Sequence, residues 1–510
     1  IKPITMSRGV FNSQNKVGEV LFFNTTSNSG TTFDPSVTFV SGLDRVSWDL
    51  GLGSGYTTGN NQSITYPDNG TVKNCQLRTN RLSKVSVLNF FQDNIYGDLD
   101  LTKFYNLYYV GFGGSSQLSA VTHSYSPTPI TYYDLSNCNI TGQHDISMLD
   151  VGGDFQMDNN SSLSGVTHTA STQSFTRYTL NNCDITGTHD LSIFPKLSGD
   201  FRIHTNSNLT KLIHTNTDPS TPNFTRYWAF NCDLTGEHDM SVLTNIGGQI
   251  YLNSNPSLTG VTHSPTTGTI TRYWSYGCDL TGNHDLSMFP KLGGSFQFFS
   301  NSNLTSITHT ANTDSSWSLY TGSNCDLTGN HDMSWCSNLG GNFTISTNPN
   351  LTGITHTAST KVFINYQAQS CDIKPQHDVS MLTGLGGFFS MGGNLSLSGI
   401  TNPVSNQTFT FYSLSDCNFT SGADFYPLSG ANFADGEIRL EDNNMSVSIV
   451  NTILQDFSGI TSNNVNSWSG VTLNISGTNS APDTTSGGIN GVAAINYLTG
   501  ATPQWSITTS

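Results

Sequence analysis

One repeated phrase constrains the fold of this chain more than any other feature of its sequence. The phrase FTRYWAFNCDLTGEHDM, which starts at Phe224, returns as ITRYWSYGCDLTGNHDL at Ile270. Seven copies align on a tyrosine that stands five residues before a cysteine, and successive cysteines are 45, 49, 46, 47, 46 and 46 residues apart. The aligned pairs are Tyr133 and Cys138, Tyr178 and Cys183, Tyr227 and Cys232, Tyr273 and Cys278, Tyr320 and Cys325, Tyr366 and Cys371, and Tyr412 and Cys417. A period this regular predicts a solenoid, in which each repeat packs on its neighbours.

Each repeat of about 46 residues has two halves with strand-like alternation. The first half reads GGNFTISTNPNLTGITH from Gly340, and the second reads YxLxxCxI, as at Tyr178. Both halves resemble the LxxLxLxxN/CxL segment of leucine-rich repeats, and the resemblance covers about 360 residues. The expected fold is mainly β, a parallel β solenoid of leucine-rich-repeat type with two coils per repeat. A right-handed parallel β-helix is the alternative. Helix signals are absent between 81 and 443, so we expect turns or extended strand on the convex side.

The period divides the chain into three expected parts, residues 1–80, 81–443 and 444–510. Residues 1–80 predict a β-sandwich or a capping domain, because β-branched and aromatic runs alternate with turn residues. Within them, VSWDLGLGSG at Val46 and ITYPDNGTV at Ile64 resemble the core signature of PKD-type immunoglobulin-like domains, with Leu52 in place of the usual Asp.

The C-terminal part predicts an α/β cap over the last coil of the solenoid. A helix is expected after Ser446, which can cap it, then a strand at Val471, a helix at Ile489 and a strand at Trp505. The text NTILQDF, GVTLNISGTNSAP and GINGVAAINYL in this part resembles the ends of structural proteins in phages of Bacteroidota and of leucine-rich surface proteins of those bacteria.

Several columns of identical residues predict the interior of the coils. The asparagines at 160, 206, 255, 301, 348 and 394 are expected to bond the backbone of the turn that leaves each strand. Glycine pairs such as Gly152-Gly153 are expected to permit a bend before each first-half strand. Equivalent cysteines would lie about 10 Å apart, too far for a disulfide, so Cys138 to Cys417 are expected to form a column of buried free thiols.

All but one of the 13 histidines fall on two repeat positions, and His204 is the exception. Six of them precede an Asp, but adjacent residues of a strand point to opposite faces, so a shared metal ion is not expected. The equivalent text at Gly97 is GDLDL, with Leu99 in the place of the histidine. We therefore expect a packed, hydrogen-bonded histidine column rather than metal ligands, and we expect acid to loosen the solenoid.

The concave face carries the candidate binding site. Residues that flank the inward tyrosines should point outward. In the third and fourth copies of the second half of the repeat, these flanking residues are aromatic or basic. In the other copies they are small and polar. The candidate residues are Arg202, His204, Arg226, Trp228, Phe230, Tyr251, Arg272, Trp274, Tyr276 and Phe299. Such a cluster has the composition of a recognition hot spot for a glycan or protein partner. The alternative is that Arg stacks on Trp across neighbouring strands and shields the sheet.

Composition and motifs narrow the function further. The net charge is -16 and no basic stripe exists, so no nucleic-acid partner is expected. No apolar run approaches the ~20 residues of a membrane helix, so no membrane insertion is expected. Catalytic motifs and cofactor loops are absent. However, the acidic residues Asp158, Asp200 and Glu237, which we expect close to the aromatic cluster, leave a polysaccharide-degrading enzyme as an alternative. We expect a non-enzymatic extracellular or virion protein without cofactor or metal, such as an adhesin or a phage tail fibre. A purely architectural subunit is a further alternative.

Overall fold

The structure is a computed structural model in which parallel β-solenoid coils make up most of the chain. It describes residues 19–26, 32–33, 35–39, 46–49, 57–59, 64–65, 72–79, 81–171, 173–214, 224–244, 246–266, 268–309, 317–336, 338–419, 425–463, 468–500 and 504–510. The chain divides into two compact units, residues 1–257 with 262–264, and residues 258–261 with 265–510. About 14 solenoid turns, 44% strand and 9% helix are present in the described part, which confirms the predicted mainly β solenoid. A right-handed parallel β-helix is also compatible with these coils.

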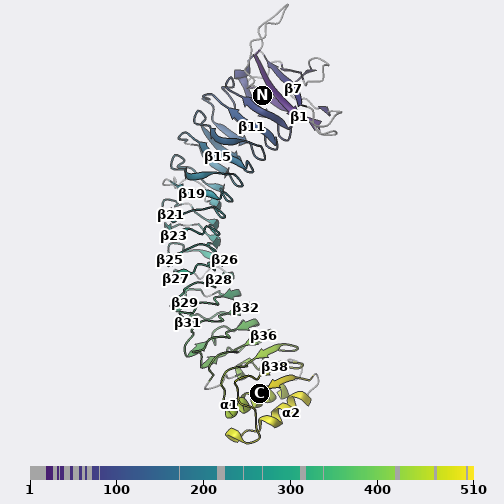
Figure 1. Cartoon of the computed structure of the whole chain (residues 1–510), viewed down its shortest axis with the longest axis vertical. Helices are drawn as coiled ribbons and strands as arrows, with labels where there is room; N and C mark the ends of the chain where they lie inside the picture. Colours follow the sequence, from purple (N-terminus) through teal and green to yellow (C-terminus); the bar gives the residue numbers. More distant parts are fainter. Residues whose placement is uncertain are drawn as a thin grey trace, which may run out of the picture. The chain divides into compact units, whose positions relative to one another are not determined.

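One side of unit 1 is a long parallel sheet to which each coil contributes one strand (Figure 1). Its strands are β8 (Val85–Asn89), β10 (Tyr109–Gly111), β12 (Ile130–Asp134), β14 (Val151–Gln156), β16 (Phe175–Thr179), β18 (Gly199–Arg202), β20 (Phe224–Trp228) and β22 (Gly248–Tyr251). The register pairs Tyr133 with Phe155, Phe155 with Tyr178, Tyr178 with Phe201 and Phe201 with Tyr227. All five side chains are fully buried, so they form a continuous aromatic column inside the coils.

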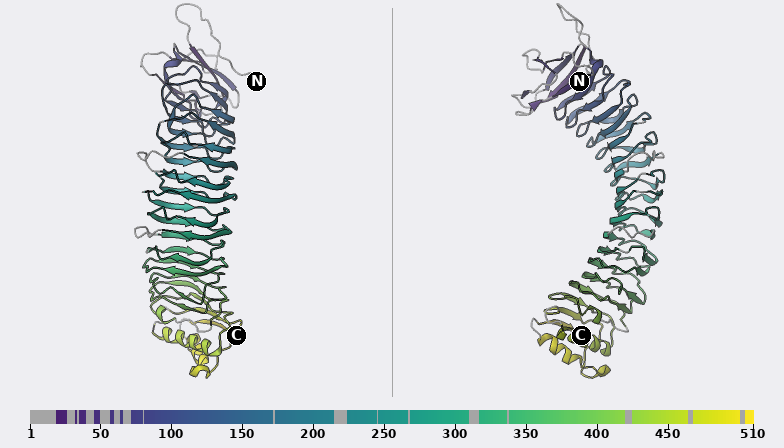
Figure 2. Two further views of the ribbon diagram at one scale, coloured as in Figure 1. Left: turned by 90° about the vertical axis from the view of Figure 1, so that its left-hand side faces the viewer. Right: turned by 180° about the vertical axis from the view of Figure 1, so that it is seen from behind.

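The opposite side of the coils consists of short parallel strand pairs, seen face on in the left view of Figure 2. Unit 1 contains β13 (Thr141–Asp145) with β15 (Ser162–Thr167), and β17 (Thr186–Asp190) with β19 (Asn208–Ile213). The strands β21 (Gly236–Met240) and β23 (Leu258–His263) have the equivalent places in the next repeat. The prediction of extended strand and turns on the convex side is therefore confirmed for the described coils.

The N-terminal strands continue both sides of the solenoid. Strand β1 (Glu19–Thr26) pairs antiparallel with β9 (Ile95–Asp100), which pairs in parallel with β11 (Gln117–Thr122), while β3 (Ser36–Phe39) pairs antiparallel with β8 on the other side. The strands before the coils are β1 (Glu19–Thr26), β2 (Thr32–Phe33), β3 (Ser36–Phe39), β4 (Val46–Asp49), β5 (Thr57–Thr58), β6 (Ile64–Thr65) and β7 (Val72–Thr79). This arrangement covers the sheet edge of the first coil. Most of the PKD-like text, including Leu52, lies outside the described residues.

Unit 2 repeats the architecture and ends in the α/β segment. Its long-sheet strands are β24 (Ile270–Trp274), β26 (Leu292–Gln297), β28 (Trp317–Thr321), β30 (Gly341–Thr344), β32 (Phe363–Gln367), β34 (Gly387–Ser390), β36 (Phe409–Ser413), β37 (Glu437–Arg439), β38 (Thr472–Ile475) and β39 (Ser506–Thr509). The short pairs are β25 (Thr281–Asp285) with β27 (Asn303–Thr308), β29 (Gly329–Met333) with β31 (Leu351–His356), and β33 (Gln376–Asp378) with β35 (Gly399–Thr401).

The helices of unit 2 match the sequence expectation. Helix α1 (Val447–Asn463) begins directly after Ser446, whose Oγ accepts a hydrogen bond from the Ile449 N–H at 3.4 Å. Helix α2 (Gly491–Gly500) packs on α1, and both lie at the yellow end of the chain in Figure 2. Single 3-10 turns occur at η1 (Leu82–Lys84), η2 (Tyr426–Leu428) and η3 (Ser486–Gly488). Among the described residues, neither helix combines the length and the apolar character of a membrane span.

The asparagine column satisfies the backbone of the turns as predicted. Asn255, which is fully buried, donates from Nδ2 to the carbonyls of Ala229 at 2.9 Å and Leu252 at 2.7 Å, and its Oδ1 accepts from the Leu234 N–H at 3.2 Å. One side chain thereby ties two successive coils together. Asn443 makes the same contacts with Leu414 and Leu440 near the end of the solenoid.

The glycine pairs and the thiols also occupy the predicted places. Gly153 has φ 59°, and a Cβ there would lie 2.1 Å from the carbonyl oxygen of Thr131 in the preceding coil. All nine cysteines are buried, and none of them forms a disulfide. Cys183 donates its thiol to the carbonyls of Met157 at 3.4 Å and Asn181 at 3.6 Å, and burial raises the pKa of this thiol to about 12. The thiols are therefore neutral backbone hydrogen-bond donors.

Candidate functional site

The outward face of the long sheet in unit 1 arranges its side chains in columns along the solenoid. The register pairs Arg177 with Asp200 and Asp200 with Arg226, and a second column contains Thr179, Arg202, Trp228 and Tyr251. Along β20, Tyr227 is fully buried whereas Arg226 and Trp228 are partly exposed, as the predicted alternation requires. Six predicted site residues, Arg202, His204, Arg226, Trp228, Phe230 and Tyr251, belong to this unit.

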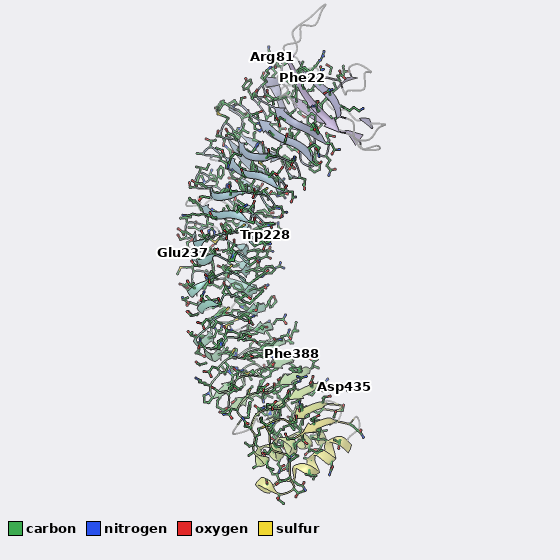
Figure 3. The ribbon with its side chains drawn as sticks, in the orientation of Figure 1. Phe22, Arg81, Trp228, Glu237, Phe388 and Asp435 are labelled. Carbon is green, nitrogen blue, oxygen red and sulfur yellow. The ribbon has the colours of Figure 1, made fainter. Side chains whose placement is uncertain are left out.

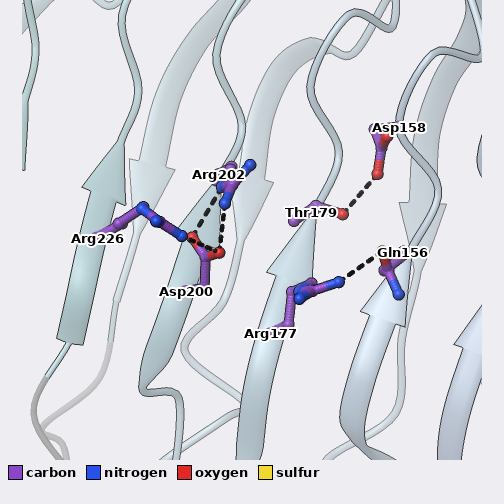
Figure 4. A network of polar contacts seen from close by, with 7 residues as sticks. All are labelled: Gln156, Asp158, Arg177, Thr179, Asp200, Arg202 and Arg226. Carbon is purple, nitrogen blue, oxygen red and sulfur yellow. Dashed lines mark hydrogen bonds and ion pairs between the residues drawn. The ribbon is translucent and has the colours of Figure 1, made fainter.

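A single carboxylate holds the two arginines of this face. Asp200, which is 7% exposed, accepts hydrogen bonds from Arg202 Nε at 2.8 Å and Arg202 Nη2 at 2.5 Å. It also accepts one from Arg226 Nη1 at 2.8 Å (Figure 4). The neighbouring Arg177 donates from Nη1 to Gln156 Oε1 at 3.0 Å, which is a neutral partner. Asp200 therefore binds two guanidinium groups, whereas Arg177, which lies between Asp154 and Asp200 in the register, bonds to an amide.

Trp228 lies between an aromatic ring and the arginines. Its indole stacks on the Tyr251 ring with centroids 5.1 Å apart and planes 9° apart. The Cζ atoms of Arg202 and Arg226 lie 4.8 Å and 5.4 Å from the indole centroid. The stacking of arginine on tryptophan that the shielding alternative requires is therefore present. The indole Nε1 is buried and has no hydrogen-bond partner among the described residues.

A second pair of stacked rings lies beside the stack of Trp228 and Tyr251. His204 and Phe230 stack with centroids 4.2 Å apart and planes 8° apart, and His204 lies 5.9 Å from Trp228. Burial, followed by the positive charge of Arg202, lowers the pKa of His204 to about 4, so its imidazole is neutral near pH 7. Asn253 in the next coil is 5% exposed, and its Oδ1 has no partner in the described part of the chain.

The other four predicted site residues belong to unit 2 and form contacts of their own. Tyr276 stacks on Phe299 with centroids 4.4 Å apart and planes 8° apart. Trp274 donates from Nε1 to Ser295 Oγ at 3.0 Å and lies 6.3 Å from Tyr276. Arg272 is exposed on β24. The pattern of stacked outward rings thus recurs in this unit.

Outward stacks also occur where the sequence reasoning expected only small polar residues. Tyr109 and Tyr132 stack in unit 1 with centroids 4.2 Å apart, and Tyr132 donates to Asp134 Oδ2 at 3.2 Å. In unit 2, Phe388 and Phe411 stack at 4.4 Å, with the Arg439 Cζ 5.4 Å from the Phe411 centroid. The residue before each inward tyrosine is Tyr132 in one case and Phe411 in the other, so the alignment itself contained the signal. The expectation that aromatics are confined to two copies was wrong.

The three acidic residues considered for catalysis do not share a site. Glu237 lies on β21, on the side of the coil opposite Trp228 (Figure 3), so its expected closeness to the aromatic cluster was wrong. Its position follows the turn that carries the chain away from the long sheet. Asp158 follows β14 and Asp200 is on β18, two strands further along, which separates them by about 10 Å along the sheet alone. Asp158 accepts a hydrogen bond from Thr179 Oγ1 at 2.7 Å, and burial raises the pKa of its carboxyl group.

The histidine columns form a buried hydrogen-bond network with the inward tyrosines. The Tyr178 hydroxyl lies 2.7 Å from His168 Nε2 and 2.8 Å from His189 Nε2, so one phenol bridges the two halves of the repeat. The same bridge occurs at Tyr133, Tyr227 and Tyr366. The neighbouring Asp190 is exposed and accepts from the Ser192 N–H at 2.8 Å. The histidine and aspartate of each dipeptide therefore point apart, and the predicted packed column is confirmed.

The sequence was also compared with known proteins. No model of a known protein family matches it, and no curated protein matches it either.

Proposed function

We propose that this chain is a non-enzymatic binding protein of an extracellular surface or a virion, with a solenoid of leucine-rich-repeat type as a rigid support. The proposed partner is a cell-surface glycan or protein, bound on the outward face of the long sheet. In unit 1 the binding residues are Arg202, His204, Arg226, Trp228, Phe230 and Tyr251, and in unit 2 they are Arg272, Trp274, Tyr276 and Phe299. An adhesin and a phage tail fibre are the settings we favour.

The observation that carries this proposal is the buried, unpartnered Trp228 Nε1 beside Asp200, Arg202 and Arg226. A buried donor without an acceptor costs free energy. In the described part of the chain, Trp317 Nε1 is also unpartnered, but that ring lies inside a coil, whereas Trp228 lies on the outward face, where Gln156 and Thr179 stand in the same column. The surrounding side chains are held by hydrogen bonds and stacking on a continuous sheet, so little conformational entropy would be lost when a partner binds.

The proposal is tested by binding of the purified chain to a glycan array and to extracts of surface proteins. The double variant Trp228→Ala with Trp274→Ala should lose binding, whereas the matched variant Phe411→Ala, which removes an outward ring elsewhere in unit 2, should retain it. Equal binding by all three proteins would refute the proposed site.

An architectural subunit is the second candidate, and the stacking geometry favours it. The ring faces of Trp228 and Tyr251, and those of Tyr276 and Phe299, cover each other along the solenoid. Rings that serve only to stiffen the sheet or to pack against another subunit would show this pattern. For that role, the double tryptophan variant should disturb assembly, and the unaltered chain should bind no glycan. Release of reducing ends from a polysaccharide, abolished by Asp200→Ala, would instead support the enzymatic alternative.

A further inference from the structure

The outward column of unit 1 that contains Arg177 and Arg226 alternates in charge. Its register order is Asp154, Arg177, Asp200 and Arg226, on strands β14, β16, β18 and β20. Arg202 on β18 also pairs with Asp200, and His204 beside it is neutral near pH 7. The positive charges that an anionic partner would meet in this column are therefore two strands apart.

Arg177 and Arg226 have unused hydrogen-bonding capacity. Among the described residues, Arg226 donates to Asp200 through Nη1 alone, and its side chain is 40% exposed. Arg177 donates to Gln156 through Nη1 alone. A guanidinium group has five N–H donors and binds a carboxylate through two parallel hydrogen bonds. Each of these arginines can therefore donate hydrogen bonds to a carboxylate of the ligand while it keeps its present contact.

The spacing of the two arginines follows from the register. Arg177 pairs with Asp200 and Asp200 pairs with Arg226, so the two arginines are two strands apart in one column. Neighbouring strands lie about 4.8 Å apart, which places the two side chains about 10 Å apart along the solenoid. A disaccharide in an extended polysaccharide has about this length. The two arginines thus match carboxylates on every second sugar, while Asp200 lies between them in the column.

We infer that the ligand of unit 1 is an acidic polysaccharide with one carboxylate per disaccharide, lying along the solenoid axis with successive carboxylates on Arg177 and Arg226. This inference rests on the proposed function and names its substrate class. Trp228, whose indole is covered by the guanidinium group of Arg226, closes the site at one end. An acidic peptide is the competing occupant, but its carboxylates project on flexible side chains and have no fixed spacing.

The test measures binding of the full chain to four soluble probes by calorimetry. These are an oligosaccharide of alternating uronate and neutral sugars, a homopolyuronate, a neutral glucan and a poly-glutamate peptide. The alternating oligosaccharide should bind best, and added salt should weaken its binding. Arg177→Gln and Arg226→Gln should each weaken binding about tenfold or more, the loss expected for a charged hydrogen bond. Lys211→Gln removes the same charge from β19, on the other side of the coil, and should leave binding unchanged.

The outcomes separate this inference from the proposed function. Stronger binding of the neutral glucan, abolished in the double tryptophan variant, would overturn the acidic ligand and leave the binding function intact. Equal or stronger binding of poly-glutamate would overturn the polysaccharide assignment. Binding of the alternating oligosaccharide that is unaffected by Arg177→Gln and Arg226→Gln would overturn the site. Unchanged denaturant midpoints would show that the two arginine variants remain folded.

Discussion

The buried histidine columns predict that the solenoid loses stability in mild acid. Burial lowers the pKa of six histidines to about 4, against a weaker opposing effect of the aspartate that follows each one; they are His144, His189, His238, His284, His331 and His377. In an unfolded chain a histidine has a pKa of about 6.5. Between these two values the unfolded chain binds protons that the folded chain does not. Stability is therefore complete above pH 6.5 and falls as the pH drops toward 4.

The magnitude follows from the two pKa values. Relative to neutral pH, each of the six histidines lowers the unfolding free energy by about 2 kcal/mol at pH 5 and by about 3.4 kcal/mol well below pH 4. Together they remove about 12 kcal/mol at pH 5, which is comparable to the total stability of a typical domain. The partner column adds to this loss, since burial also lowers the pKa of His123 to about 3 and that of His168 well below its usual value.

The assay is the urea midpoint by circular dichroism at a series of pH values from 8 to 4.5, with amide hydrogen exchange to follow individual repeats. Repeat proteins open locally, so exchange should rise first in the repeats that contain the Tyr-His bridges. The first coil, which has Leu88 and Leu99 at the tyrosine and histidine positions, should keep its protection longer. Stability that stays constant or rises as the pH falls from 7 to 5 would refute the reasoning.

At the histidine positions, other repeats of this chain have residues that do not titrate, and these residues define the test variants. His189→Leu copies Leu99, and the Tyr178 hydroxyl keeps its bond to His168. His168→Asn copies Asn402, whose Oδ1 accepts a hydrogen bond from the Tyr412 hydroxyl at 2.8 Å. Each substitution should reduce the loss of unfolding free energy between pH 7 and pH 5 by about 2 kcal/mol. Lys211→Gln is the control that should leave the loss unchanged.

Three further predictions concern the interior. Asn255→Ala should lower the unfolding free energy by about 3 kcal/mol or more, measured by urea denaturation, because it leaves two carbonyls and one N–H buried without partners; equal stability would contradict the bridging role. Gly153→Ala should cost more than about 2 kcal/mol in the same assay, since the added Cβ meets the Thr131 carbonyl at a positive φ. Cys183 should react with a thiol reagent only after denaturant unfolds its coil, because its pKa is raised to about 12; rapid reaction of the native chain would argue against the buried column.

The sequence predicted the interior well because the interior repeats. Asn255 and Cys183 hydrogen-bond to backbone groups that recur in other described repeats, and His189 bonds to the hydroxyl of the inward Tyr178, so a periodic residue identifies a periodic contact. The bridging role of the tyrosine hydroxyls was not predicted, although the constant distances from each tyrosine to both histidines contained the signal. Spacing along the chain cannot show that two side chains from different sheets meet inside the coil.

The outward face was harder to predict because it does not repeat. The expected residues Trp228 and Arg226 do lie there, but the sequence could not show that Arg202 covers the indole or that Asp200 joins both arginines. These contacts depend on rotamers chosen among neighbours from three coils. Glu237 was placed on the wrong side since the turn after the cysteine carries the chain across the coil before this residue is reached.

The two faces of each strand are therefore under different physical constraints. An inward residue must fit the residues of the neighbouring coils, so the choice of tyrosine at position 227 is constrained by the contacts of Tyr227 with Phe201 and with its two histidines. An outward residue at the position of Arg226 meets only other residues of the sheet surface, and the chain uses Tyr132, Leu319 and Phe411 there without a change of the coil. Substitutions at outward positions should accordingly have small effects on stability. This separation allows a single solenoid to carry different outward surfaces along its length.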